Sequence, residues 1–137
     1  MCGFICVIKR PGTKPQSIPQ DTLFHRGPDY TREIFHKSIS LRHWRLAIVD
    51  LNTRSNQPFE NANYALAYNG EIYRYKSIGI DSFDQQFFSD THLIFESVTS
   101  NSIHNFKRSS GYYSYLLLNK QDDTVTGSRD YLGQKPL

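Results

Sequence analysis

The sequence predicts a strand-rich α+β domain, and three observations carry this prediction. Several short segments alternate apolar and polar side chains, or form compact apolar runs with β-branched residues, at the length of β-strands. Turn signals, chiefly prolines and the pairs Asn-Gly and Asp-Asp, separate these segments. One segment near residue 90 has the capping residues and apolar spacing of an α-helix. The 137 residues fit one domain with one core.

The composition argues against several other classes of protein. The longest uncharged stretch is shorter than the roughly 18 apolar residues of a membrane helix, and no basic-then-apolar leader is present. Two cysteines, Cys2 and Cys6, are too few for a disulfide framework or a structural zinc site. The net charge is +3 without a long Lys/Arg run, so nucleic-acid binding is not expected. We therefore expect a cytoplasmic chain with reduced thiols, no membrane contact and no metal.

Three strands are expected in the N-terminal half. The apolar run 4–8 predicts a buried strand, with Cys6 as a packed core thiol. Segment 11–22 contains three prolines and is predicted to be a loop with at most one helical turn. Residues 33–35 and 38–44 read as two further strands, and the second of these alternates clearly.

Two polar features of this half have both a structural and a binding interpretation. The motif His-Arg-Gly-Pro-Asp at 25–29 contains a turn signal. Its polar side chains either form hydrogen bonds with the backbone of the turn itself or line a site. Arg45 stands just before the apolar run 46–51, where a guanidinium can hold a carboxylate with two hydrogen bonds or form a surface ion pair. Residues 56–59 predict another turn.

The pair Asn69-Gly70 also has two interpretations. Residues 64–68 alternate and lead directly into it, and Asn-Gly is the strongest short hairpin signal, so the local pattern favours a turn. Alternatively, the Asn amide and the Gly N–H point at one oxygen atom, as in an oxyanion hole.

The C-terminal half predicts one helix and one hairpin. Segment 74–88 is mixed and supports no prediction. Ser89 or Asp90 caps a helix that continues through apolar positions, unless Asp90 faces a ligand amine instead. Residues 112–118 form a strong strand pattern, and a turn at Asp-Asp leads back into a partner strand at 124–126.

Cys2 becomes the first residue if Met1 is removed. Its α-amine would then have a pKa of about 7.7–8.0 and could take the proton of the thiol on the same residue. The other interpretation is a near-terminal residue without a role, and the first six residues alone favour it.

The order of motifs along the whole chain resembles the class II glutamine amidotransferase domain, and within it the N-terminal domain of asparagine synthetase. The resemblance extends from the first residue to the last and reverses the interpretation of Cys2 to a functional one. The motifs that carry it are Met-Cys-Gly at 1–3, His-Arg-Gly-Pro-Asp at 25–29, His-Trp-Arg-Leu-Ala-Ile-Val-Asp at 43–50, Asn-Gln-Pro-Phe at 56–59, Tyr-Asn-Gly-Glu-Ile-Tyr at 68–73, Ser-Asp-Thr at 89–91 and Arg-Asp…Gly…Lys-Pro-Leu at 129–137.

This resemblance implies a fold and a reaction. The implied fold is an N-terminal-nucleophile hydrolase-like sandwich of two antiparallel β-sheets flanked by helices. The implied reaction is hydrolysis of the glutamine side-chain amide to glutamate and ammonia, with the ammonia passed to an asparagine-synthetase-type partner or domain.

The resemblance also implies the site residues. Cys2 resembles the nucleophile, with its own α-amine as base, while Asn69 and Gly70 resemble the oxyanion hole. Arg45 resembles the group that binds the α-carboxylate of glutamine, and residues 25–29 shape the walls rather than transfer protons. The remaining substrate contacts implied are Asp90 for the α-ammonium, Glu71 assisting it, and backbone groups near Ile48 and Val49.

The chain also departs from the family. Segment 11–22 is shorter than usual, and His92 stands where a Glu usually follows the Ser-Asp-Thr motif. The family continues into further strands and then an ATP-dependent synthetase domain. We therefore expect residues 1–137 to be a partial type-2 domain, incomplete at the C-terminus. It is expected to have no cofactor of its own, because ATP and magnesium would belong to the synthetase domain.

Two functions stay open at this point. One is a glutaminase half-enzyme of asparagine biosynthesis that takes glutamine as substrate and works with a synthetase. The synthetase is either a further domain or a separate subunit. The other is a non-catalytic remnant that binds glutamine or a partner synthetase, which retention of Met1 would favour. The joint presence of Cys2, Arg45, Asn69, Gly70 and Asp90 favours the enzyme.

Overall fold

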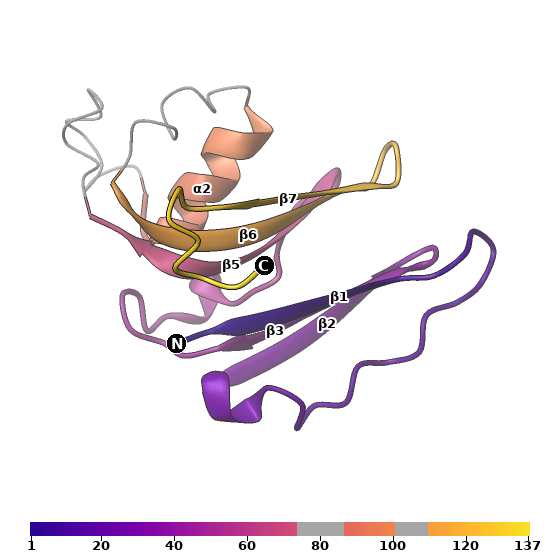
Figure 1. The fold of residues 1–137 in the computed structure, drawn as a ribbon, viewed down its shortest axis with the longest axis horizontal. Coiled ribbons are helices and arrows are strands. Elements are labelled where there is room, and N and C mark those ends of the chain that lie inside the picture. The colour runs from indigo at the N-terminus through magenta and orange to yellow at the C-terminus, as the bar shows by residue number, and fades with distance from the viewer. Residues whose placement is uncertain (74–86, 101–109) are drawn as a thin grey trace.

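Two antiparallel β-sheets lie face to face in the computed structural model, which describes residues 1–73, 87–100 and 110–137 (Figure 1). The strands are β1 (Gly3–Ile8), β2 (Tyr30–His36), β3 (Ile39–Arg45), β4 (Phe59–Glu60), β5 (Tyr64–Ile72), β6 (Gly111–Asn119) and β7 (Thr124–Arg129). The helices are the 3₁₀ turns η1 (Phe24–Arg26) and η2 (Thr53–Ser55) and the α-helix α2 (Asp90–Thr99). The first sheet has the order β1-β3-β2 and the second β4-β5-β6-β7.

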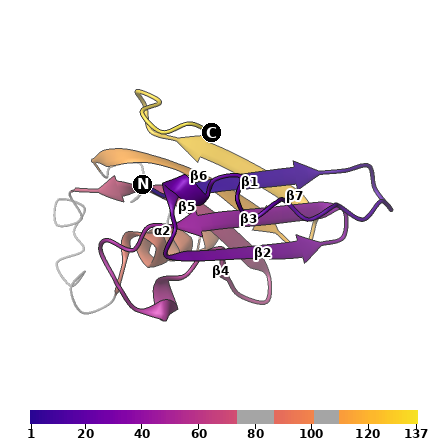
Figure 2. The same cartoon turned by 90° about the horizontal axis from the view of Figure 1, so that it is seen from below.

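The three strands predicted for the N-terminal half are confirmed and together form the first sheet. Figure 2 shows them side by side, with β3 in the middle. Cys6 on β1 and Ile34 on β2 both pair with Leu41 on β3. Segment 11–22 is a loop that leads into η1, as its prolines predict. Cys6 packs against the apolar cluster between the sheets, and burial raises the pKa of its thiol.

Strand β5 separates two apolar cores, because successive side chains of a strand point to opposite faces. Ala65 and Ala67 face the first sheet and contribute to the core between the sheets. Leu66 and Tyr68 face the other way, where α2 covers the outer side of the second sheet (Figure 1). The alternation that predicted a strand at 64–68 therefore reflects two cores rather than one core and solvent.

The hairpin turn predicted at Asn69-Gly70 is wrong. Both residues lie inside β5, where Asn69 pairs with Ser114 and Gly70 with Tyr113 of β6. A Cβ atom on Gly70 would overlap the backbone of β6, so the glycine is needed for close approach of a neighbouring strand rather than for a turn. This neighbour lies more than forty residues away in sequence, so a local pattern does not reveal it.

The remaining elements agree with the pattern of the C-terminal half. Ser89, rather than Asp90, caps α2: its Oγ accepts a 3.2 Å hydrogen bond from the His92 N–H. The strand at 112–118 is confirmed as part of β6, and Asp123, with a φ of 61°, turns the chain into β7. Residues 74–86, for which the sequence supported no prediction, lie outside the described part of the chain. Every helix in that described part is too short or too polar to cross a membrane.

Candidate active site

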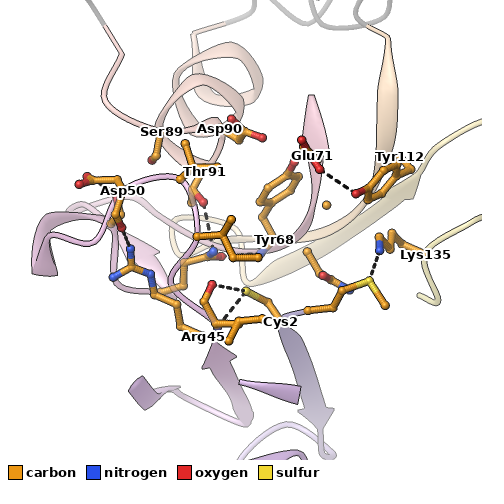
Figure 3. Close-up of a pocket in the computed structure, with 18 residues that line it drawn as sticks. Cys2, Arg45, Asp50, Tyr68, Glu71, Ser89, Asp90, Thr91, Tyr112 and Lys135 are labelled. Atoms are coloured by element: carbon orange, nitrogen blue, oxygen red, sulfur yellow. Dashed lines mark hydrogen bonds between the residues drawn. The ribbon is translucent and has the colours of Figure 1, made fainter. Parts of the chain in front are cut away.

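One cavity at the end of the sandwich brings together all eight residues that the sequence nominated (Figure 3). It is partly open to solvent. These residues come from four separate parts of the chain and are Cys2, Arg45, Ile48, Val49, Asn69, Gly70, Glu71 and Asp90. The structure therefore places the predicted residues close enough to act on one ligand.

The Cys2 thiol is held by the backbone of the loop that follows β3. It donates to the Leu46 carbonyl at 3.6 Å, and the Leu46 N–H donates to Sγ at 3.3 Å. Burial raises the pKa of the thiol, although the Leu46 hydrogen bond, the terminal ammonium and Arg45 act in the opposite direction. With Met1 in place, the nitrogen of Cys2 is an amide, so it offers no base to the thiol.

The Gly70 N–H points to the edge of β5 that β6 does not cover. Backbone groups of an antiparallel strand alternate between its two edges. The Tyr73 N–H pairs with Ser110, on the side of β6, whereas the Tyr68 and Ile72 N–H groups bond the side chains of Gln57 and Asp90. Gly70 lies midway between Tyr68 and Ile72, so its N–H faces the same edge. This edge offers a backbone donor beside the Asn69 side chain in the cavity.

Arg45 stabilises the loop 46–56 with its buried guanidinium. Its Nη1 donates to the Asn52 carbonyl at 3.0 Å and to Asn56 Oδ1 at 2.7 Å, and its Nη2 donates to the Asp50 carbonyl. The alternative interpretation of Arg45, a surface ion pair, is not found among the described residues. Arg45 also lines the cavity, so the loop that carries Ile48 and Val49 is tied to a cation at the cavity wall.

Asp90 places a buried carboxylate at the first residue of α2. Its Oδ2 accepts a 3.0 Å hydrogen bond from the Ile72 N–H at the end of β5. A carboxylate in the first turn also interacts favourably with the positive end of the helix dipole. The acid is therefore held between a strand and a helix while it lines the cavity.

Glu71 lies at the rim of the cavity rather than inside it. It is exposed, and its Oε2 accepts a 2.7 Å hydrogen bond from the Tyr112 hydroxyl. Hydrogen bonds with Tyr73 and Glu71 raise the pKa of Tyr112. The contact with Tyr112 orients Glu71 but already uses one of its oxygens.

Side chains of the motif at 25–29 bond backbone groups of the nucleophile segment and of the loop after β3. Arg26 Nη2 donates to the Cys2 carbonyl at 3.4 Å, and Asp29 Oδ2 accepts from the Ala47 N–H at 2.7 Å. A Cβ atom on Gly27 would lie 2.5 Å from the backbone of Trp44 and Arg45. His25 is not among the residues that line the cavity. These contacts agree with the predicted role in shaping the wall.

Gln57 and Lys135 are buried polar residues of the cavity that sequence reasoning did not identify. Gln57 bridges β5 and α2: its Oε1 accepts from the Tyr68 N–H at 2.7 Å and its Nε2 donates to Thr91 at 3.1 Å. Lys135 lines the cavity with a buried side chain. Both residues stand directly before a proline in motifs that carried the resemblance, which was the only signal available for either of them.

The cavity contains a thiol together with side chains of opposite charge. Arg45 lies on one side and the Asp90 carboxylate on another (Figure 3). A ligand with both a carboxylate and an ammonium group, such as a free α-amino acid, matches this distribution of charge. In the described residues no group of three His, Cys, Asp or Glu side chains is placed to hold a metal ion.

Comparison with known proteins agrees with this chemistry. A family model described as "Glutamine amidotransferase domain" matches residues 1–137. The chain is 28% identical to asparagine synthetase [glutamine-hydrolyzing] 1 of Bacillus subtilis and 31% identical to asparagine synthetase [glutamine-hydrolyzing] 3 of Arabidopsis thaliana. It is 27% identical to the amidase chry2 of Gibberella zeae. All three alignments cover 100% of the chain and 24% to 25% of the relative, so the chain spans about a quarter of their length.

Proposed function

Because the chain belongs to the glutamine amidotransferase domain family, we propose that it hydrolyses the side-chain amide of glutamine with Cys2 as nucleophile. The observation that carries the proposal is the convergence at one cavity: a thiol, a backbone donor, a cation and a carboxylate, each from a different part of the chain. The proposal requires removal of Met1, which frees the α-amine of Cys2.

The first step forms a bond between sulfur and the amide carbon. The α-amine takes the proton of the thiol, and the thiolate adds to the carbon, so the carbonyl oxygen becomes negatively charged. The Gly70 N–H and the Asn69 amide would donate hydrogen bonds to this oxygen. One such donor is typically worth about 3–4 kcal/mol in the transition state.

The second step breaks the bond between carbon and nitrogen. The protonated α-amine gives its proton to the leaving nitrogen, which departs as ammonia and leaves a thioester on Cys2. A water molecule, deprotonated by the same amine, then hydrolyses the thioester to glutamate and restores the thiol.

The charged residues would orient the substrate. Arg45 would bind the α-carboxylate and Asp90 the α-ammonium, with Glu71 assisting from the rim. Backbone groups near Ile48 and Val49 would close the pocket on the side of the loop. Holding both ends of the amino acid fixes its side-chain amide against Cys2, and this fixed geometry accounts for much of the rate in such reactions.

The same proposal includes a fold type and a partner. The two facing sheets with the nucleophile at the start of β1 suit an N-terminal-nucleophile hydrolase sandwich. The names of the first two relatives support an asparagine-synthetase-type domain or subunit as the receiver of ammonia. Cytoplasmic localisation and independence from a cofactor stay predictions for this chain.

The test compares chains that differ only at the N-terminus. A fusion protein cleaved immediately before Cys2 supplies the chain without Met1, and direct expression with intact-mass selection supplies the chain with it. We expect glutamate and ammonia release from the first and none above background from the second. Cys2→Ala is expected to abolish release, while Cys6→Ala, which removes the other thiol, is expected to retain it.

The alternative function has its own outcome in this test. If the cleaved chain binds glutamine but releases glutamate no faster than Cys2→Ala, the chain is a binding module and the catalytic proposal is wrong.

A further inference from the structure

Lys135 carries a buried ammonium into the cavity and forms no ion pair with a carboxylate in the described part of the chain. Its side chain is only 5% exposed and lines the same cavity as Cys2. Among the described residues, no Asp or Glu lies within ion-pair distance of its Nζ. Its neighbours are the Tyr112 ring, whose centroid lies 4.3 Å from Nζ, and the sulfur of Met1, to which it donates a hydrogen bond.

The fold holds Lys135 in this place through its backbone. The Asp130 carboxylate accepts hydrogen bonds from the N–H groups of Leu132 and Gln134, at 3.1 Å each, and of Lys135, at 3.4 Å. It also accepts one from the Tyr113 N–H on β6, at 3.1 Å, which anchors the turn to the second sheet. The lysine therefore enters the cavity because the turn after β7 is folded around Asp130, not because an acid attracts it.

A buried ammonium without a counter-ion is unfavourable for folding. The thioether of Met1 is a weak acceptor and compensates little of that cost. Burial lowers the pKa of Lys135, as does Arg26, whereas Asp130, Cys2 and Glu71 raise it. A position that is costly for stability and lines the same cavity as the nucleophile points to a role in the reaction.

We propose that Lys135 is a positioning residue whose ammonium, once Met1 is removed, keeps the α-amine of Cys2 in its neutral form and favours the Cys2 thiolate. Met1 links the two groups in the structure: its side chain contacts Lys135, and its carbonyl carbon is bonded to the Cys2 nitrogen. This inference rests on the proposed function, since it concerns the base and nucleophile of that reaction. Lys135 itself neither gains nor loses a proton.

The effect follows from the signs of the charges. A cation near an amine disfavours the protonated amine, and a cation near a thiol favours the thiolate. After the thiol proton has moved to the amine, repulsion from Lys135 also makes the new ammonium a better acid toward the leaving nitrogen. The charged groups that face this region are Arg26 from η1, Arg45 from β3, Glu71 from β5, Asp130 after β7, and the Tyr112 hydroxyl from β6.

Lys135 and Arg45 are both cations of the cavity, but they differ in position and in contacts (Figure 3). The two cations lie on opposite sides of Cys2. The hydrogen bonds of Arg45 go to the loop 46–56, whereas Lys135 lies against Met1 and Tyr112. Arg45 therefore interacts with the loop at the cavity wall and Lys135 with the N-terminus.

The test uses chains cleaved to start at Cys2, with Lys135→Met, Lys135→Gln, Lys135→Arg and a control, Lys14→Met, which removes an equal charge from an exposed loop residue. Two pH profiles are measured: the rate of Cys2 alkylation by iodoacetamide, read by peptide mass spectrometry, and kcat/KM for glutamine. For Lys135→Met and Lys135→Gln we expect the midpoint of each profile to rise by about one pH unit. Lys135→Arg and Lys14→Met are expected to match the unmodified chain.

The outcomes separate this inference from the proposed function. Coincident profiles for the unmodified chain and a folded Lys135→Met or Lys135→Gln chain overturn the inference, even if the melting temperature changes, because a structural role alone moves stability and not the profiles. If the unmodified chain does not hydrolyse glutamine, the proposed function fails. The alkylation profile then still decides whether Lys135 acts on Cys2.

Discussion

The Ile72 N–H donates a 3.0 Å hydrogen bond to the Asp90 carboxylate, so the strand that carries Asn69 and Gly70 ends on the acid that begins α2. This contact couples two parts of the proposed site. Any movement of the helix start would also move the strand edge that offers the Gly70 N–H. The contact also makes it possible to remove the charge of Asp90 without removing its structural role.

Asp90→Asn is expected to weaken glutamine binding with little effect on the fold. An Asn oxygen still accepts from the Ile72 N–H, but the negative charge for the substrate ammonium is lost. A charge-assisted hydrogen bond of this kind is worth about 1.5–3 kcal/mol, so KM should rise about 10- to 100-fold while kcat changes less. Steady-state kinetics test this, with Asp21→Asn in an exposed loop as the control. An unchanged KM would remove Asp90 from the substrate site.

Asn69→Ala is expected to act on the chemical step instead. Loss of one oxyanion donor should lower kcat about 100- to 1000-fold, while glutamine binding in the ground state changes little. The control is Asn63→Ala, at an exposed position just before β5. A fall in kcat of less than about fivefold in a folded Asn69→Ala chain would contradict the oxyanion role, because the expected loss from one such donor is far larger.

Most strands could be predicted from the sequence because they follow their own local alternation. The exceptions are the short β4, which overlaps a predicted turn, and the second half of β5. The first sheet and the hairpin of β6 and β7 agree with the predicted segments to within a few residues. Ser89 and Asp90 are both suitable caps by residue type. The hydrogen bond from the His92 N–H and the extended backbone of Ser89 identify Ser89 as the cap. Local patterns therefore locate most of the elements in this chain, but they do not give the end of β5.

Contacts between distant segments could not be predicted in this way. Gly70 resembles a turn residue in sequence, yet the strand that requires it begins at Gly111. The burial of Lys135 depends on four N–H groups gathered by Asp130, and no composition rule places a lysine beside a nucleophile. The site residues were nominated by the order of motifs, and the cavity brings them together without testing their roles.

Gly70→Ala is expected to destabilise the chain through this close approach. The added Cβ would overlap the backbone of Tyr112 and lie 2.6 Å from the Tyr113 Cα, and backbone atoms cannot rotate away. Overpacking of this kind typically costs about 1–3 kcal/mol in the free energy of unfolding. Urea denaturation measures it.

A matched control for Gly70→Ala lies on β7. In Gly127→Ala the added Cβ would lie 3.1 Å from the side-chain ends of Leu116 and Leu137, which can shift. We therefore expect Gly127→Ala to lose less stability than Gly70→Ala. Equal losses would show that the spacing between β5 and β6 is not the limiting contact.

His43 makes the free energy of unfolding depend on pH below about pH 6.5. The side chain is fully buried, Nε2 lies 3.0 Å from the Tyr68 carbonyl, and Nδ1 has no partner among the described residues. Burial lowers the pKa of His43 from 6.5 to about 4, and nearby Arg45 acts in the same direction, while the Tyr68 contact opposes both. The unfolded chain therefore binds more protons than the folded chain between these two pH values.

The sign of the effect follows from this difference in proton binding. The contribution of His43 to stability is fully present above about pH 6.5 and is lost as the pH falls through about 4. The stability lost by pH 4 amounts to about 3 kcal/mol. Gln can donate to the Tyr68 carbonyl but does not titrate, so His43→Gln should flatten the loss of stability between pH 6.5 and 4. Urea midpoints measured across this range test the prediction. An identical slope in both chains would assign the acid sensitivity to other groups.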